Sequence, residues 1–324
     1  MAARTSVTLE QARSFLADYV AAVPQRLSAV ERGTVNSSYE IVLSPGRVFL
    51  RLYEEQDRAG AIAEAERLSY LASCGVVTPH PLRRLGGGFV GEMAGKPAVL
   101  FPWIDGDMRC LRSVTEEDGR RVGEALGRLH VAGVEAPRGP GRFEPADLRV
   151  RLRRIAAAPD ARIACQAAPL VEKLRVWETR RDAALPRGLI HGDLFRDNVL
   201  WNEQNEICAL LDFESASDGV LAYDLMVTVL AWSFKDTLDE AIARSIAVGY
   251  RSVRTVIDSE LQGLAAEAAI AALRFTVTRL TDDALRSLET GAPPRADKDW
   301  RRFAQRLAWV ESYGADGMRS LFAK

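Results

Sequence analysis

The sequence predicts an α+β fold with two lobes, a sheet-based N-terminal lobe and a larger, mainly helical C-terminal lobe. Strand-like segments and turns fill the first hundred residues, whereas most of the chain after Gly106 has helical patterns. With 324 residues, 48% of them hydrophobic, the chain can bury a sizeable core and is long enough for two lobes. We place the boundary at the short connector PWIDG, which gives an N-terminal lobe over 1–102 and a C-terminal lobe over 103–324.

The elements of the N-terminal lobe follow from turn and helix signals. Residues 38–43 and 47–53 are rich in β-branched and aromatic side chains and flank SPG, which suits a hairpin turn. Residues 59–75 have apolar side chains near helical spacing and end at Gly75, as is typical of a helix C-terminus. The glycine-punctuated stretch 82–106 predicts three short strands. We therefore expect a small antiparallel sheet with one helix.

The C-terminal lobe is predicted to begin with a helix over 115–133. Thr115 is a plausible capping residue, and Asp118 follows three residues later. The remainder is mostly helical apart from one strand-like stretch, and loops are expected at 137–145 and 290–299.

Charge and composition exclude several classes of partner. The 43 basic and 44 acidic residues give a net charge of -1, so neither nucleic acid nor a membrane surface is an expected partner. The four cysteines are scattered without a CxxC pair, as in reduced cytoplasmic proteins. No segment reaches the roughly 20 apolar residues that span a bilayer, and the N-terminus has no apolar stretch of signal-peptide length. We expect a soluble, cytoplasmic protein that binds a small molecule; its oligomeric state is left open.

Polar side chains crowd the stretch LIHGDLFRDNVLWNEQNEICALLDFE (189–214), between apolar runs that predict short buried strands. Polar residues at the ends of buried strands cost free energy unless they have partners, so the cluster calls for an explanation. A turn at NEQNE would bring the outer ends of two strands together, and with them Asn198 and Asp212. Their oxygens could hold magnesium jointly with phosphates, which leaves Asp193 to meet a substrate hydroxyl.

This stretch resembles the catalytic and metal motifs of the kinase-like phosphotransferases, which include aminoglycoside phosphotransferases, choline kinases and one type of homoserine kinase. The matching pattern is H-G-D-x-x-x-x-N from His191 to Asn198, then strand, turn, strand and D-F at Asp212. The resemblance implies a bilobal protein-kinase-like fold that binds ATP and Mg²⁺ between its lobes. It implies that Asp193 accepts the proton of the attacking hydroxyl, that Asn198 and Asp212 bind magnesium, and that His191 and Asp224 brace the loop.

Similarity over longer stretches, beyond the motif itself, indicates the homoserine kinases of this superfamily. LIHGDLFRDNVLW resembles their catalytic loop, with Phe195-Arg196-Asp197 where aminoglycoside enzymes more often have His-Pro-Gly. The likeness extends over nearly the whole chain except the stretch 134–186. The implied reaction converts L-homoserine to O-phospho-L-homoserine, a step of threonine biosynthesis.

Nucleotide binding is expected in the N-terminal lobe without the usual glycine-rich loop. The stretch 33–42 resembles a nucleotide-loop hairpin but has only Gly33, so backbone amides and polar side chains would hold the phosphates. These side chains are Asn36, Ser37 and Ser38.

Arg51 stands where protein kinases carry the phosphate-binding lysine, with Glu64 as the expected helix partner and Glu66 as the alternative. Whether Arg51 faces the nucleotide or solvent stays open. The candidates for lining the adenine slot are Phe101, Trp103 and Ile104.

The acceptor site is less well defined. Glu214 replaces the glycine of the DFG motif, and an amino-acid substrate would need a cation for its carboxylate. The acceptor candidates are Arg196, Glu214, Arg274 and Arg279.

Three other functions remain open. An aminoglycoside or other amino-alcohol kinase would need an acidic acceptor pocket. A nucleotide-binding pseudokinase would tolerate Arg51 and the missing glycines, although intact Asp193, Asn198 and Asp212 argue against it. A structural partner protein without a ligand would leave the clustered carboxylates unexplained.

Overall fold

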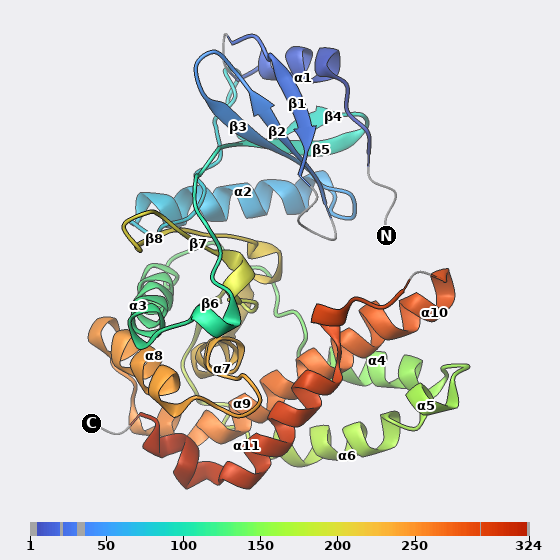
Figure 1. The fold of residues 1–324 in the computed structure, drawn as a ribbon, viewed down its shortest axis with the longest axis vertical. Helices are drawn as coiled ribbons and strands as arrows, with labels where there is room; N and C mark the ends of the chain where they lie inside the picture. Colours follow the sequence, from blue (N-terminus) through green and yellow to red (C-terminus); the bar gives the residue numbers. More distant parts are fainter. Residues whose placement is uncertain (1–4, 20–21, 31–35, 292, 323–324) are drawn as a thin grey trace. The chain divides into compact units, whose positions relative to one another are not determined.

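The computed structural model describes residues 5–19, 22–30, 36–291 and 293–322 and has an antiparallel sheet of five strands followed by a mostly helical remainder (Figure 1). This confirms the predicted α+β class. The chain divides into two compact units. The first comprises Met1–Met108, Glu135–Pro137 and Val199–Glu214, and the second comprises Arg109–Val134, Arg138–Asn198 and Ser215–Lys324. The lobe boundary drawn from the sequence stays a prediction.

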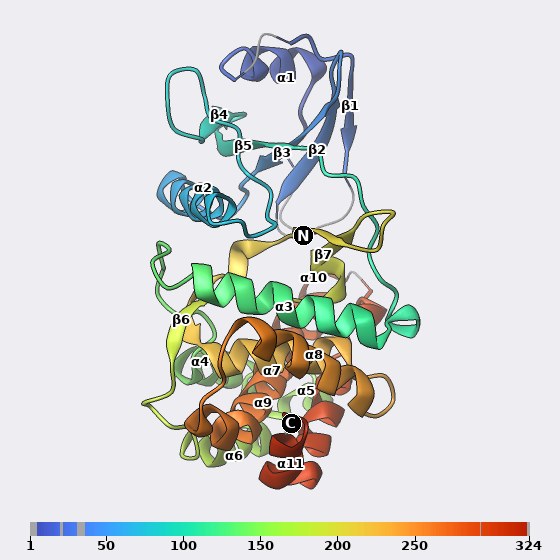
Figure 2. The same ribbon diagram turned by 90° about the vertical axis from the view of Figure 1, so that its left-hand side faces the viewer.

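The first unit is built on the five-stranded sheet, whose strands pair antiparallel in the order β1-β2-β3-β5-β4. The strands are β1 (Arg26–Ala29), β2 (Ser37–Val42), β3 (Arg47–Leu52), β4 (Gly91–Met93) and β5 (Lys96–Pro102). Burial alternates along β3, where Leu50 and Leu52 join the core that contains Phe15 of α1 (Leu9–Leu16). The opposite face of β3 carries Arg51, which contacts α2 (Arg58–Ser73). The two helices therefore cover opposite faces of the sheet (Figures 1 and 2).

Most of the local predictions for this unit are confirmed. The hairpin around SPG forms as β2 and β3, with Val42 paired to Arg47, and the predicted helix forms as α2. The prediction of three strands within 82–106 was wrong, because residues 82–90 form an irregular segment before β4. Gly87 and Gly88 both have positive φ there, a conformation that suits turns rather than strands.

Two elements of this unit were not predicted, namely α1 and β1. The start of α1 does have a local signal, since Thr8 caps it and Gln11 completes a capping box. Residues 31–35, which include Gly33 of the expected nucleotide loop, lie outside the described residues.

A second hairpin in this unit consists of β7 (Val199–Trp201) and β8 (Ile207–Leu210). Val199 pairs with Leu210, and the Leu210 N–H donates to the Val77 carbonyl at 2.6 Å. Because β7 directly follows Asn198 and β8 ends two residues before Asp212, this hairpin sets where Asp212 leaves the strand.

The second unit is mainly helical. Its helices are α3 (Glu116–Ala132), α4 (Pro145–Ala156), α5 (Ala161–Ala164), α6 (Ala167–Glu178), α7 (Leu221–Trp232), α8 (Glu240–Val253), α9 (Asp258–Arg279), α10 (Arg286–Thr290) and α11 (Arg301–Ser320), with a π-helical segment at Leu280–Leu285. A short antiparallel pair, β6 (Arg187–Ile190) and β9 (Ser217–Val220), completes it. None of the helices in the described part of the chain combines the length and apolar character needed to cross a membrane.

Helix α3 begins as predicted, because the Thr115 side chain accepts from the Asp118 N–H and forms a capping box. It packs along α8, as Figure 2 shows. Glycine permits the close approach: a Cβ added at Gly123 would lie 2.1 Å from the Ile246 carbonyl oxygen. This packing places His130, in the last turn of α3, next to Tyr250 of α8.

Candidate active site

The loop that follows β6 is held by a buried carboxylate. Asp224, in the first turn of α7, is 0% exposed and accepts the backbone N–H groups of His191 and Gly192, each at 2.7 Å. Gly192 has a φ of 75°, which glycine adopts without strain. His130 Nε2 lies 3.0 Å from the same carboxylate. Asp224 thus fixes the start of the loop that carries Asp193.

The charge on Asp224 is stabilised by its neighbours. Burial by itself would raise the pKa of the carboxyl, but the hydrogen bond from His130 and the charges of His130 and His191 outweigh it, so the pKa is lowered from its ordinary value. His130 is in turn fixed by Tyr250, whose hydroxyl lies 2.7 Å from Nδ1. An ionised carboxylate can accept all of these hydrogen bonds at once.

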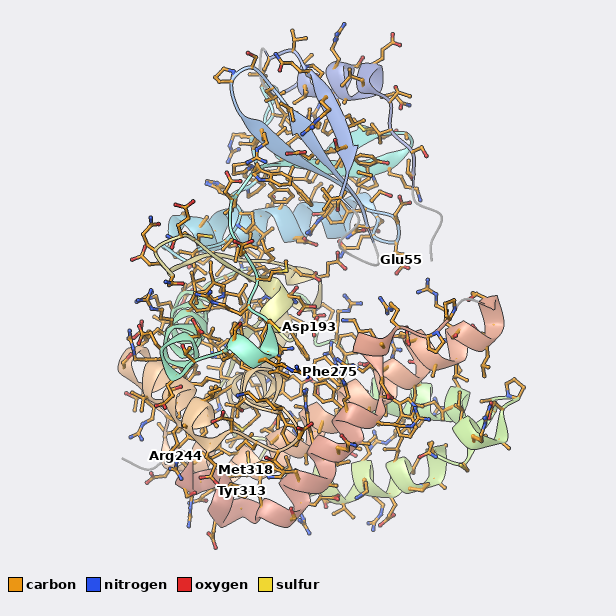
Figure 3. The ribbon with its side chains drawn as sticks, in the orientation of Figure 1. Glu55, Asp193, Arg244, Phe275, Tyr313 and Met318 are labelled. Atoms are coloured by element: carbon orange, nitrogen blue, oxygen red, sulfur yellow. The ribbon has the colours of Figure 1, made fainter. Side chains whose placement is uncertain are left out.

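Asp193 lies beside a cation. Its Oδ1 is 3.4 Å from Nη1 of Arg274 on α9, and its side chain is 29% exposed. Arg274 itself is buried, and the central carbon of its guanidinium lies 3.8 Å from the ring centre of Phe275. Figure 3 labels Asp193 and Phe275, the two residues that Arg274 contacts. The carboxylate is therefore held on one side and remains accessible to a substrate.

Asn198 is oriented by the same loop. Its Nδ2 donates to the backbone carbonyl of Asp193 at 2.7 Å, and the residue is buried at the end of the 3₁₀ turn Arg196–Asn198. An amide that donates through its nitrogen presents its oxygen to another partner. That orientation suits a metal ligand.

Asp212 has a φ of 61°, in the left-handed region that non-glycine residues seldom adopt. Such backbone conformations cost free energy and cluster at functional sites. Two residues on, Glu214 accepts a hydrogen bond from Nδ2 of Asn36, and Oδ1 of Asn36 accepts the Glu54 N–H at 3.1 Å. The segment after β8 is thus tied to the beginning of β2.

Arg51 faces these carboxylates. Its Nη1 donates to Oε1 of Glu64 at 2.9 Å, while Glu66 is exposed, so Glu64 is the ion-pair partner. Burial would lower the pKa of Arg51, but the charge of Glu64, with those of Glu214 and Asp212, raises it above its ordinary value. Nε of Arg51 has no hydrogen-bond partner among the described residues. A half-buried guanidinium with a spare donor fits a phosphate oxygen.

The other nucleotide candidates divide between the two faces of the sheet. Ser38 is paired with Arg51 in the sheet register, and Phe101 with Phe49, so these side chains share the face that α2 covers. Trp103 lies next to these side chains, because its ring centre is 6.4 Å from that of Phe49. Ser37 faces the other way.

Ser37 is buried, and its hydroxyl donates to the carboxylate of Glu54. Its side chain is therefore committed within the sheet. Ile104 is half-buried after the end of β5. The roles of all these residues in nucleotide binding stay predictions.

The acceptor candidates lie on both units. Arg274 contacts Asp193 as described. Arg196 donates to the Ala231 carbonyl, and Arg279 donates to the Asp299 carbonyl at 3.3 Å. Glu214 belongs to the first unit. Sequence reasoning missed Arg306, which stacks on Phe303 of the same helix.

The donor set fits a metal that is bound jointly with a nucleotide. Within the described ranges, no group of three or more His, Cys, Asp or Glu residues could hold a metal ion by itself. Asn198 and Asp212 offer only oxygen, and magnesium typically takes one or two carboxylates together with substrate phosphates. The role of Asn198 and Asp212 as magnesium ligands stays a prediction.

Comparison with known proteins decides the family. Residues 26–264 match the phosphotransferase enzyme family, APH. The chain belongs to this family. The phosphotransferase is 30% identical to the homoserine kinase of Methylobacillus flagellatus and 33% identical to that of Beijerinckia indica, in each case over 87% of this chain and 88% of the relative. The resemblance to kinase-like phosphotransferases is thereby confirmed.

The phosphotransferase also has the fold of solved kinases. An amicoumacin kinase, solved in complex with AMP-PNP, Ca²⁺ and Ami, aligns with a TM-score of 0.70 at 15% identity over 94% of each chain. The chain is thus a small-molecule kinase that phosphorylates an alcohol. Membership of this family implies the use of a nucleoside triphosphate and a divalent metal.

Proposed function

We propose that this phosphotransferase transfers the γ-phosphoryl group of ATP to the hydroxyl of L-homoserine, with Mg²⁺, and forms O-phospho-L-homoserine. The observation that carries the choice of acceptor is the cation beside Asp193, since Arg274 lies 3.4 Å from its carboxylate. An amino-acid acceptor needs positive charge for its own carboxylate, whereas a polyamine antibiotic needs negative charge. The two homoserine kinase relatives, matched over most of their length, support the same acceptor.

In this reaction Asp193 accepts the proton of the attacking hydroxyl. The hydroxyl oxygen forms a bond to the γ-phosphorus while the bond from that phosphorus to the β,γ-bridging oxygen breaks, and the proton remains on the Asp193 carboxylate until water removes it. Arg274 holds the carboxylate in place and adds positive charge next to the transferred group. Most of the rate enhancement would come from such positioning and charge stabilisation.

Several residues and a pair of metal ligands are proposed to bind ATP. Arg51, anchored by Glu64, would use its spare Nε to donate to a phosphate oxygen. Asn198 and Asp212 would hold magnesium, which when bound supplies positive charge to the phosphates. Ser38, Phe101 and Trp103 lie on the Arg51 face of the sheet and are the remaining nucleotide candidates with that orientation.

The test is an ATP-consumption screen over L-homoserine, choline, hydroxylysine and several aminoglycosides, with GTP as the alternative donor. We expect the highest kcat/KM for L-homoserine with ATP. A higher kcat/KM for an aminoglycoside or for choline would reject the proposed acceptor and leave the kinase assignment in place. The product should be identified by mass, because consumption alone does not show where the phosphoryl group went.

A further inference from the structure

Arginine side chains gather around one aromatic ring in the second unit. The guanidinium of Arg306 on α11 lies 4.1 Å from the ring centre of Phe303, and that of Arg279, at the end of α9, lies 4.6 Å from it. The ring of Phe195 packs against Phe303 at 5.9 Å, which brings the loop carrying Arg196 to the same place. Aromatic faces stabilise guanidinium groups without neutralising their charge.

Arg306 is buried, and no carboxylate in the described part of the chain forms an ion pair with it. It is 7% exposed, and its Nε and Nη1 have no hydrogen-bond partner among the described residues. Burial, with the positive charges of Arg279, Arg196 and Arg302, lowers the pKa of Arg306 to about 9. The side chain still carries its charge at neutral pH. A buried cation with unmet donors costs free energy unless an anion completes its surroundings.

Two of the surrounding arginines donate to backbone carbonyl groups. Arg196 donates to the Ala231 carbonyl and Arg279 to the Asp299 carbonyl, and both acceptors are neutral. One carboxylate, that of Asp197, interacts with Arg196.

The cluster reaches the protein surface and the loop of Asp193. Arg302 is exposed and Arg196 half-buried, so two of the four arginines are in contact with solvent. Arg196 follows Asp193 by three residues on the same loop. On the other side, Phe275 stacks on Phe303 at 4.7 Å, next to Arg274, which contacts Asp193.

We propose that Arg196, Arg279, Arg302 and Arg306 form an oxyanion site that receives the carboxylate of the acceptor and so selects an amino acid over an amino alcohol. The inference rests on the proposed function, since it deepens the choice of acceptor. A carboxylate would accept from the unmet donors of Arg306 and offset the mutual repulsion of the four guanidinium groups. An acceptor without a carboxylate would leave the buried cation unpaired.

The test compares two acceptors that differ by the carboxylate alone, L-homoserine and 3-aminopropan-1-ol, in the intact enzyme. The variants are Arg306→Met and Arg302→Gln; the second removes an exposed side chain and does not threaten folding. Arg319→Gln, on the exposed face of the same helix, is the matched control. Steady-state kcat and KM are measured at saturating ATP.

With Arg306→Met, kcat/KM for L-homoserine should fall roughly 10- to 100-fold, mainly through KM, as expected for loss of a charged hydrogen bond. The value for 3-aminopropan-1-ol should stay at that of the parent enzyme, and Arg302→Gln should show the same selectivity to a smaller degree. Equal losses for both acceptors, or no loss for either variant, would overturn the proposal.

A parent enzyme that does not phosphorylate L-homoserine would reject the proposed function, and the oxyanion site would then be tested by itself. Thermal unfolding is followed with and without inorganic phosphate. Stabilisation of the parent enzyme and of Arg319→Gln but not of Arg306→Met would support an oxyanion site and reject only the acceptor. Equal responses in all three would reject the site as well.

Discussion

At the residue scale, the proposed chemistry depends on Asp193 more than on any other side chain. Its carboxylate contacts Arg274, and its backbone carbonyl orients Asn198, so one residue combines two functions that a single substitution can separate. Replacing the carboxylate by an amide keeps the backbone contact and removes the proton acceptor.

Asp193→Asn should retain nucleotide binding and lower kcat by about 10²- to 10⁴-fold, the usual contribution of general base catalysis. Turnover is measured with the best acceptor of the screen, and ATP binding by calorimetry. Normal turnover in a variant that binds ATP normally would remove Asp193 from the mechanism.

The substitution that tests Asp212 has to suit its left-handed backbone conformation. A φ of 61° penalises alanine, whereas glycine accepts it, so Asp212→Gly deletes the carboxylate without adding strain. We expect this variant to lose the magnesium dependence of nucleotide binding and to keep the thermal stability of the parent enzyme. An unchanged magnesium titration would contradict the assignment of Asp212 as a ligand.

At the scale of elements, the start of α7 holds the loop after β6. Asp224 accepts two backbone N–H groups of that loop and contacts His130 of α3, so it joins two helices and the loop. Its folded-state pKa is lowered, which means that its contribution to stability is present above the unfolded pKa of about 3.9 and is lost as pH falls through the folded value.

Asp224→Asn should therefore reduce the free energy of unfolding at pH 7, by about 3–5 kcal/mol if it behaves as a broken buried ion pair. The difference from the parent enzyme should shrink as pH falls below about 4, because the carboxyl of the unfolded parent chain takes up a proton there while that of the folded chain keeps its charge to lower pH. Urea unfolding at several pH values measures it. A difference that does not change with pH would mean that the charge of Asp224 is not what stabilises the loop.

At the scale of the whole molecule, the features that were predicted correctly are those that depend on a few consecutive residues. The SPG turn, the Thr115 cap and the HGD motif are each contained in a few consecutive residues, and each predicted its element or family correctly. The glycines at 86–88 led to a wrong prediction. They were interpreted as a turn between two strands, whereas they belong to one irregular segment.

What could not be predicted depends on residues that are distant in the sequence. Nothing in KDWRRFAQRL shows that Arg306 is buried beside arginines that come from a loop and another helix. In the same way, alternation along FLRLY left the direction of Arg51 open until the register of β3 and the position of Glu64 fixed it.

The chain leaves the first unit after Met108, returns to it briefly at Glu135–Pro137 and again for hairpin β7–β8, and leaves it finally after Glu214. This path of the chain limits which chimeras of related sequences keep the contacts within the first unit. A chimera with a single crossover near Met108 would inherit the sheet of one parent and the hairpin of the other, so Leu210 and Val77, which are hydrogen-bonded here, would come from different ancestors. Exchange of the complete second unit that preserves this contact needs five crossovers, after residues 108, 134, 137, 198 and 214.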